Sequence, residues 1–141
     1  MNDYQKQAAD FLAKHSIKFS AKLSNTKTPQ WDGRNHNHFI VSLSRSDKRI
    51  SFDFFDSQNN FEKGIKTLDA YSVLACCSAD INCPETFEEF CADFGYPAYN
   101  EHTGKKDKQS FNTFKACKKQ SEKLNKLFNT AEMREDLSKI Q

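Results

Sequence analysis

The sequence predicts an α+β fold, with an N-terminal helix, a three-stranded antiparallel sheet and about four helices packed on it (α-β-β-β-α-α-α-α). Three observations support this prediction. Apolar residues alternate with polar ones in three segments between residues 16 and 55. Most segments outside that region place apolar residues three or four positions apart, as helices do. Thirteen phenylalanines among 141 residues can fill one core, so we expect residues 1–141 to form a single domain.

The first half of the chain contains the predicted sheet. Residues 3–14 form an amphipathic helix pattern, for which Asp3 is the expected N-cap. Residues 16–24 alternate as a half-buried strand does. Residues 25–37 are polar and predict a loop, whereas residues 38–44 and 48–55 alternate on either side of a turn at residues 45–47 and predict a hairpin.

The second half predicts helices. The apolar spacing favours a helix over residues 68–78 and a second one from Thr86, whose hydroxyl and Glu89 suit a capping box. Gly95 is placed to end this helix, and its expected apolar stripe is Phe87, Phe90, Cys91 and Phe94. After a Lys-rich loop at residues 100–109, which we expect to be mobile, Ser110 is the expected cap of a long helix to about residue 129. Thr130 is expected to cap a last short helix.

The net charge of +2 is divided unevenly along the chain. Residues 1–50 carry +5, residues 51–96 carry −7, residues 97–126 carry +5 and residues 127–141 carry −1. Such a pattern suits either a folded dipole or an ordinary solvated surface, and it requires neither nucleic acid nor a membrane. No apolar run follows Met1 and no 18-residue apolar stretch occurs, so we expect a cytoplasmic protein whose five cysteines are reduced.

The sequence indicates neither a metal site nor an enzyme. The cysteines lack the paired spacing of structural zinc sites, and we expect most of them to be buried, with Cys83 the most exposed and reactive. His36 and His38 would share a strand face but have no evident third ligand. No phosphate-binding loop, dinucleotide fingerprint or nucleophile motif occurs, so we expect no cofactor, no metal and no catalytic residues.

Three groups of residues are candidate binding surfaces. Trp31 in the polar loop either folds back onto the sheet edge or serves as an exposed anchor for a partner. Glu88 and Asp93 belong to an acidic helix surface. The third group consists of lysines of the loop and the long helix that either keep the surface solvated or contact nucleic acid phosphates, namely Lys105, Lys106, Lys115, Lys119 and Lys126.

Two resemblances add to these patterns. The element order α-β-β-β-α over residues 3–78 is similar to that of double-stranded-RNA-binding domains, but no lysine-rich segment begins the helix at residues 67–69. Residues 69–76 (DAYSVLAC) and 86–96 (TFEEFCADFGY), with the YQKQAADFL helix, resemble a family of small uncharacterised phage and prophage proteins. The loop at residues 25–37 is longer here, and residues 77–83 form an insertion relative to that family.

The second resemblance implies a mobile-element context. Small phage proteins without enzyme motifs often inhibit host machinery, and anti-CRISPR proteins are an example. We therefore expect a non-catalytic protein that binds and inhibits a host defence complex, such as a Cas effector, in the host cytoplasm. The alternative is a nucleic-acid-binding accessory protein that uses the Lys-rich helix.

Overall fold

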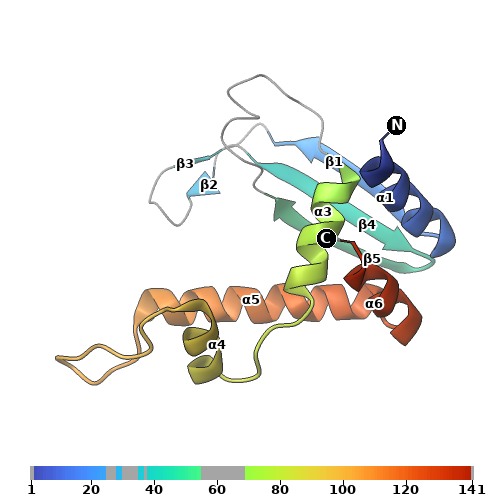
Figure 1. Ribbon diagram of the computed structural model, residues 1–141. Helices are drawn as coiled ribbons and strands as arrows, with labels where there is room; N and C mark the ends of the chain where they lie inside the picture. The colour runs from blue at the N-terminus through green and yellow to red at the C-terminus, as the bar shows by residue number, and fades with distance from the viewer. Residues whose placement is uncertain (1, 25–27, 30–34, 37, 55–68, 141) are drawn as a thin grey trace.

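A three-stranded antiparallel sheet with strand order β1–β4–β5 lies at the centre of the computed structural model, which describes residues 2–24, 28–29, 35–36, 38–54 and 69–140 (Figure 1). The strands of this sheet are β1 (Lys18–Leu23), β4 (Phe39–Arg45) and β5 (Lys48–Phe54). The helices are α1 (Asp3–Lys14), α3 (Ala70–Asp80), α4 (Phe87–Phe94), α5 (Lys108–Leu127) and α6 (Ala131–Ser138). The predicted α+β class and the order of its elements are thus confirmed.

One face of the sheet forms the main core. Phe39, Val41 and Leu43 alternate along the central strand β4, and their side chains are fully buried. Ile40 on the opposite face of that strand is 40% exposed, so the described elements cover the sheet on one side. Arg45 pairs with Lys48 across a two-residue turn, and Ser46 in that turn has a positive φ of 54°.

Helices α1, α3 and α6 and the C-terminal half of α5 cover the apolar face of the sheet. Their buried side chains join the strands in one cluster, which includes Phe11, Leu74, Leu124, Phe128 and Leu137. The end of α3 is held on α5 by two hydrogen bonds to the Ile81 carbonyl, from Ser121 Oγ at 2.7 Å and from Asn125 Nδ2 at 3.1 Å. Ser121 therefore lies in the apolar stripe of α5 without leaving its hydroxyl unpaired.

The N-terminal half of α5 extends beyond the sheet and carries α4 (Figure 1). Phe87, Phe90 and Cys91 of α4 pack with Phe114 of α5 in a second buried cluster, separate from the main core. We call α4, the segment 95–107 and the N-terminal half of α5 the distal lobe. The sequence predicted helices after the sheet, and the structure shows that α4 packs on α5.

Two predicted helix caps are wrong by one to three positions. Asn2, and not Asp3, caps α1, because its side chain accepts a hydrogen bond from the Gln5 N–H at 2.8 Å. Asp107 caps α5 by accepting from the Ser110 N–H at 2.9 Å, and Ser110 itself is buried within the helix. Both stretches contain several residues suited to capping, so local propensity did not decide between them.

The other caps agree with the prediction, and one connection differs from it. Thr86 caps α4 by accepting from the Glu89 N–H, and Gly95 ends it with a φ of +73°, as predicted. Thr130 caps α6, also as predicted. Within the polar segment predicted as a loop, residues 28–29 (β2) and 35–36 (β3) pair as a two-stranded antiparallel sheet.

The expectation that most cysteines are buried, with Cys83 the most exposed, is wrong, because only two of the five are buried and Cys117 is half-buried. Cys77 and Cys91 are buried, whereas Cys76 is exposed and Cys83 is half-buried. Cys76 is therefore more exposed than Cys83, because the buried face of α3 is formed by Val73, Leu74 and Cys77. None of the helices in the described parts of the chain is long and apolar enough to cross a membrane.

Candidate binding surfaces

The distal lobe is built from aromatic rings on both sides of the α4–α5 contact. Phe87 packs edge-on against Phe111 with 5.4 Å between ring centroids, and Phe90 packs against Phe114 at the same centroid distance. In each helix the two rings are three residues apart, which places them on one side of that helix, facing the other helix. The lobe therefore has its own aromatic core.

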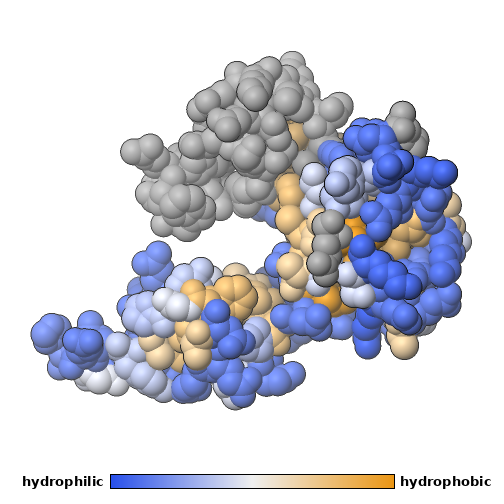
Figure 2. Space-filling view, viewed as in Figure 1, coloured by the Kyte–Doolittle hydropathy of each residue, from blue (hydrophilic) through white to orange (hydrophobic). Residues whose placement is uncertain are grey.

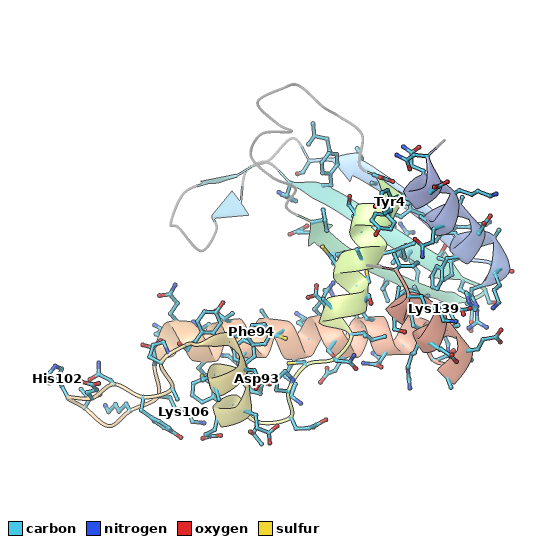
Figure 3. The ribbon with its side chains drawn as sticks, in the orientation of Figure 1. Tyr4, Asp93, Phe94, His102, Lys106 and Lys139 are labelled. Carbon is cyan, nitrogen blue, oxygen red and sulfur yellow. The ribbon has the colours of Figure 1, made fainter. Side chains whose placement is uncertain are left out.

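Three aromatic side chains remain exposed at the surface of this lobe. Phe94, Tyr96 and Tyr99 are 55%, 43% and 45% exposed, and we call them the aromatic patch. Phe94 and Tyr96 are stacked, with an interplanar angle of 11° and 6.3 Å between centroids. Apolar surface is visible on this part of the molecule in Figure 2, and Figure 3 shows Phe94 beside Asp93 at the end of α4.

The prediction that Phe94 belongs to the buried stripe of α4 is wrong. Its spacing from Phe90 and Cys91 is helical, and its ring does contact Phe90 at 4.8 Å between centroids. However, α4 ends at Phe94, and the chain turns away at Gly95. No further element covers the ring among the described residues, so more than half of the Phe94 side chain faces solvent.

A hairpin-like segment follows α4 and holds Tyr99 in place. Tyr99 pairs with Lys106 in an isolated antiparallel bridge, and the Asn100 side chain accepts hydrogen bonds from the His102 and Thr103 N–H groups. Figure 3 shows His102 at the tip of this segment. The segment predicted as a loop at residues 100–109 is therefore a turn with local hydrogen bonds that leads into α5 at Lys108, and its mobility stays a prediction.

Tyr99 also connects this segment to α4. Its hydroxyl donates a 2.6 Å hydrogen bond to Glu88 Oε1. This bond stabilises the ionised carboxylate, so the pKa of Glu88 is lowered, and the same bond raises the pKa of Tyr99. Glu88 is therefore oriented toward the aromatic patch rather than free to rotate in solvent.

Several lysines of the lobe lie over aromatic rings. Lys106 Nζ is 4.8 Å from the centroid of Phe111 and 5.6 Å from that of Phe87. Lys115 Nζ is 5.0 Å from the Phe111 centroid. Lys118 Nζ lies 5.9 Å from the Phe114 centroid and 3.4 Å from Glu85 Oε2. These cations pack on the apolar lobe and keep its rings covered on that side.

The exposed face of α5 carries a row of lysines. Lys108, Lys115, Lys119 and Lys126 are all exposed, and their spacings of seven, four and seven residues place them within about 40° around the helix axis. The row is about 27 Å long at 1.5 Å per residue. Among the residues that the structure describes, Lys115, Lys119 and Lys126 have no carboxylate within ion-pair distance.

The predicted site residues thus fall into separate places. Glu88, Asp93, Lys105 and Lys106 belong to the distal lobe, with Lys115 on its α5 side. Lys119 and Lys126 continue along α5 toward the sheet. Trp31 lies outside the described residues. The structure therefore brings the acidic residues and the loop lysines together but does not join them to Lys126.

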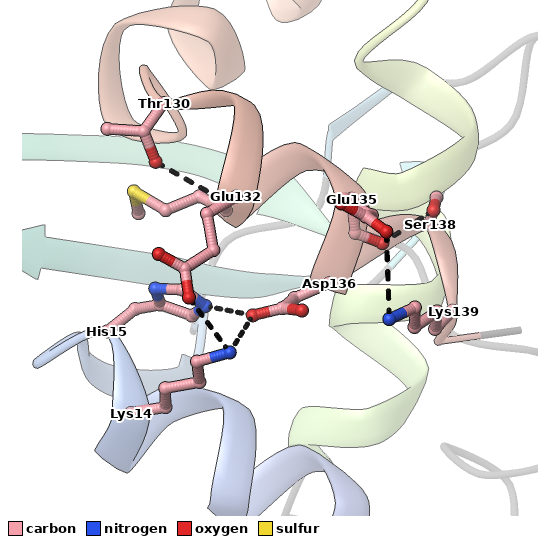
Figure 4. Close-up of polar contacts among 9 residues, drawn as sticks. Lys14, His15, Thr130, Glu132, Glu135, Asp136, Ser138 and Lys139 are labelled. Carbon is pink, nitrogen blue, oxygen red and sulfur yellow. Dashed lines mark hydrogen bonds and ion pairs between the residues drawn. The ribbon is translucent and has the colours of Figure 1, made fainter.

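Sequence reasoning missed the aromatic patch and one further cluster. Tyr96 and Tyr99 flank Pro97 just after a helix-ending glycine, a position where exposure could have been expected. The other cluster joins α1 to α6, where Lys14 and His15 meet Glu132 and Asp136 (Figure 4). No spacing in the sequence indicates that contact, because it links opposite ends of the chain.

The titratable groups of the described residues form no metal site, since no cluster of three or more His, Cys, Asp or Glu side chains occurs among them. His38 is buried, and its Nε2 lies 3.5 Å from Asp53 Oδ1 on the neighbouring strand. Burial, together with the Cys83 side chain, raises the pKa of Cys117 to about 12, which disfavours a nucleophilic thiolate there.

Comparisons with known proteins add no family to this description. No family model matches the chain. Searches of curated proteins and of solved structures likewise give no match.

Proposed function

We propose that this protein is an accessory protein of a phage or another mobile element that binds and inhibits a host defence complex, such as a Cas effector. It acts by occupying a protein surface in a stoichiometric complex, without catalysis. The resemblance of residues 69–76 and 86–96 to small phage proteins supports the mobile-element context. The observation that carries the proposal is the aromatic patch on the distal lobe.

The aromatic patch has the composition of a protein-binding surface. Exposed tyrosines and phenylalanines contribute much of the binding energy in interfaces, because their rings bury a large area and lose little conformational entropy. Here Phe94 and Tyr96 are stacked on each other and both pack against Phe90, so their orientation is fixed before a partner binds. Prior ordering of this kind lowers the entropic cost of association.

The surroundings of the patch suit an interface as well. A cavity of about 490 Å³ lies beside Tyr96 and is lined by Pro97, Asp107, Gln109, Ser110 and Thr113. Asp93 is exposed next to Phe94, and Glu88 is held by Tyr99. Such a polar rim around an aromatic centre is the arrangement found in specific interfaces, and the hollow can accept a side chain of the partner.

The experiment uses the tagged full-length protein in a nuclease-treated host lysate, followed by mass spectrometry. The proposal expects a subunit of a defence complex, and it expects the purified complex to lose activity as the added protein reaches an equimolar ratio. Phe94→Ala with Tyr96→Ala should weaken binding at least about thirtyfold, the loss typical of an aromatic hot spot.

The matched control is Tyr4→Ala, since Tyr4 is 60% exposed but lies on α1, outside the distal lobe. This variant should inhibit as the parent protein does. Full inhibition by the Phe94 and Tyr96 double variant would rule out the aromatic patch as the contact surface. Inhibition by far less than one equivalent would instead indicate catalysis and contradict the proposed mechanism.

A further inference from the structure

We propose that a second surface of this protein binds the phosphate backbone of double-stranded nucleic acid without reading its sequence. This surface, called the basic face, consists of Lys108, Lys115, Lys119 and Lys126 of α5 together with Lys48 and Arg49 of β5. It uses none of the three aromatic residues on which the proposed inhibitor function depends. The inference therefore stands or fails independently of that function.

The tertiary structure joins the two parts of the basic face. Lys48, Arg49 and Lys126 line one cavity of about 410 Å³, together with Asp47, Ile50, Leu127 and Asn129. This contact could not be predicted from the sequence, because the hairpin and the end of α5 are far apart along the chain. The lysine row of α5 therefore continues onto the β4–β5 turn.

Two hydrogen bonds hold the end of α5 on the hairpin. Arg45 Nη1 donates to Asn129 Oδ1 at 3.2 Å, and Lys123 Nζ donates to the Ser51 carbonyl at 3.1 Å. The buried Leu127 packs the same part of α5 into the main core. The cations of the basic face are thus carried by a helix and a strand that are fixed relative to each other, which reduces the ordering cost of binding.

The charge of this face complements a polyanion. Asp47 lines the same cavity as Lys48, Arg49 and Lys126. Glu85 and Glu122 line a second cavity with Lys126, and Asp107 directly precedes Lys108. No described carboxylate is within ion-pair distance of any of the six. Lys118 differs, since Glu85 pairs with it. Within the described parts of the chain, no ion pair therefore neutralises the cations of the basic face, and binding of phosphates would release counterions.

The composition and shape of the basic face favour a duplex over a single strand. Proteins that bind single strands stack bases on exposed aromatic rings. The exposed aromatic residues of the described chain are Tyr4, Phe94, Tyr96 and Tyr99, and none of them lies on α5 or β5. A straight row of cations about 27 Å long spans about eight base pairs of a duplex at 3.4 Å each.

The test measures fluorescence anisotropy of a labelled 20-base-pair DNA duplex of arbitrary sequence, an RNA duplex of the same length and the single strand, between 50 and 200 mM NaCl. We expect either duplex to bind more tightly than the single strand, with affinity that falls steeply with salt. Charge reversal at Lys115→Glu, Lys119→Glu and Lys126→Glu should weaken binding at least about tenfold. It should also reduce the salt slope, which is the steepness with which the logarithm of the binding constant falls with the logarithm of the salt concentration, by about three.

A matched variant controls for total charge. Lys6→Glu, Lys22→Glu and Lys139→Glu change the net charge equally at exposed positions on α1, on β1 and directly after α6, and this variant should retain most of the affinity. Equal losses in the two triple variants would show a general charge effect and overturn the proposal. Thermal unfolding of each variant establishes that it is folded.

A separate variant tests whether the basic face extends from α5 onto the hairpin. Lys48→Gln with Arg49→Gln should reduce the salt slope by about two. An unchanged slope would contradict the claim that the basic face continues from α5 onto the hairpin. Tighter binding of the single strand would overturn the assignment to a duplex. The Phe94→Ala and Tyr96→Ala variant should bind duplex normally, so a failure of the inhibitor proposal and a failure of this one give different results.

Discussion

His15 Nε2 lies 2.7 Å from Asp136 Oδ2, and this contact joins the end of α1 to α6 across most of the length of the chain. Lys14 Nζ contacts the same carboxylate oxygen at 2.8 Å and also reaches Glu132 Oε1 at 3.1 Å (Figure 4). The His15 side chain is 8% exposed and that of Asp136 is 20% exposed. The cluster therefore closes the main core where the N-terminal and C-terminal helices meet.

Replacing Asp136 should lower stability in a pH-dependent way. The hydrogen bond from Lys14, followed by the one with His15, lowers the pKa of Asp136 in the folded protein. A carboxylate with a lowered folded-state pKa stabilises the fold above its unfolded pKa of about 4, and this contribution is lost as the pH falls through the folded pKa. Asp136→Asn should therefore lower the unfolding temperature at neutral pH and have a diminishing effect below about pH 4.

Thermal unfolding measured by circular dichroism between pH 2 and pH 7 tests this expectation. Glu135→Gln is the control on the same helix, because the Glu135–Lys139 pair is exposed and its atoms are 3.9 Å apart. That change should have little effect at any pH. A constant difference between Asp136→Asn and the parent protein across the whole range would contradict the assigned role of the carboxylate.

Removing the Tyr99 hydroxyl should change the titration of Glu88. In Tyr99→Phe the 2.6 Å hydrogen bond is lost, so the pKa of Glu88 should rise toward the ordinary value for a glutamate. Carboxyl chemical shifts followed by NMR as a function of pH provide the measurement. Asp136, whose pKa is lowered by Lys14 and His15 at the α1–α6 contact, serves as an internal reference whose titration should not move.

The cysteines should differ in their reactivity toward iodoacetamide at mildly alkaline pH. Cys76 is exposed and should be modified first, followed by the half-buried Cys83. Burial raises the pKa of Cys77 and Cys91, so these two should react only when the protein is unfolded. Peptide mass spectrometry over a time course gives the order, and early labelling of Cys77 would contradict the packing of α3.

The main core and the aromatic core of the distal lobe should respond differently to the truncation of a buried side chain. Leu124→Ala removes a fully buried side chain of the main core and should cost about 2–5 kcal/mol of global stability. Phe90→Ala opens the core of the distal lobe, where Phe90 contacts Phe94, Tyr96 and Phe114. We expect this change to reduce hydrogen-exchange protection mainly in α4.

Hydrogen exchange read by mass spectrometry distinguishes the two outcomes. In Phe90→Ala, the amides of β4 should keep the protection that they have in the parent protein, because their side chains belong to the main core. In Leu124→Ala, protection should fall in β4 and in α5 together. Loss of protection throughout the chain in Phe90→Ala would show that the two cores unfold as one unit.

The sequence alone determined the type and order of the helices and of the three strands β1, β4 and β5. Alternation at Phe39, Val41 and Leu43 marks the central strand, and the caps at Thr86, Gly95 and Thr130 were predicted because each depends on residues within one turn. Lysine spacing along α5 also follows from the sequence, since a regular helix fixes the directions of its own side chains.

The tertiary structure alone decided which surfaces these elements form together. Phe94 has the spacing of a buried residue, but it is exposed because α4 ends there and nothing in the described chain covers it. Lys126 meets Lys48 and Arg49, and Asp136 meets Lys14 and His15, through contacts between segments far apart in the sequence. Local patterns hold no information about such contacts, because they depend on how the amphipathic faces of whole helices and strands pack against one another.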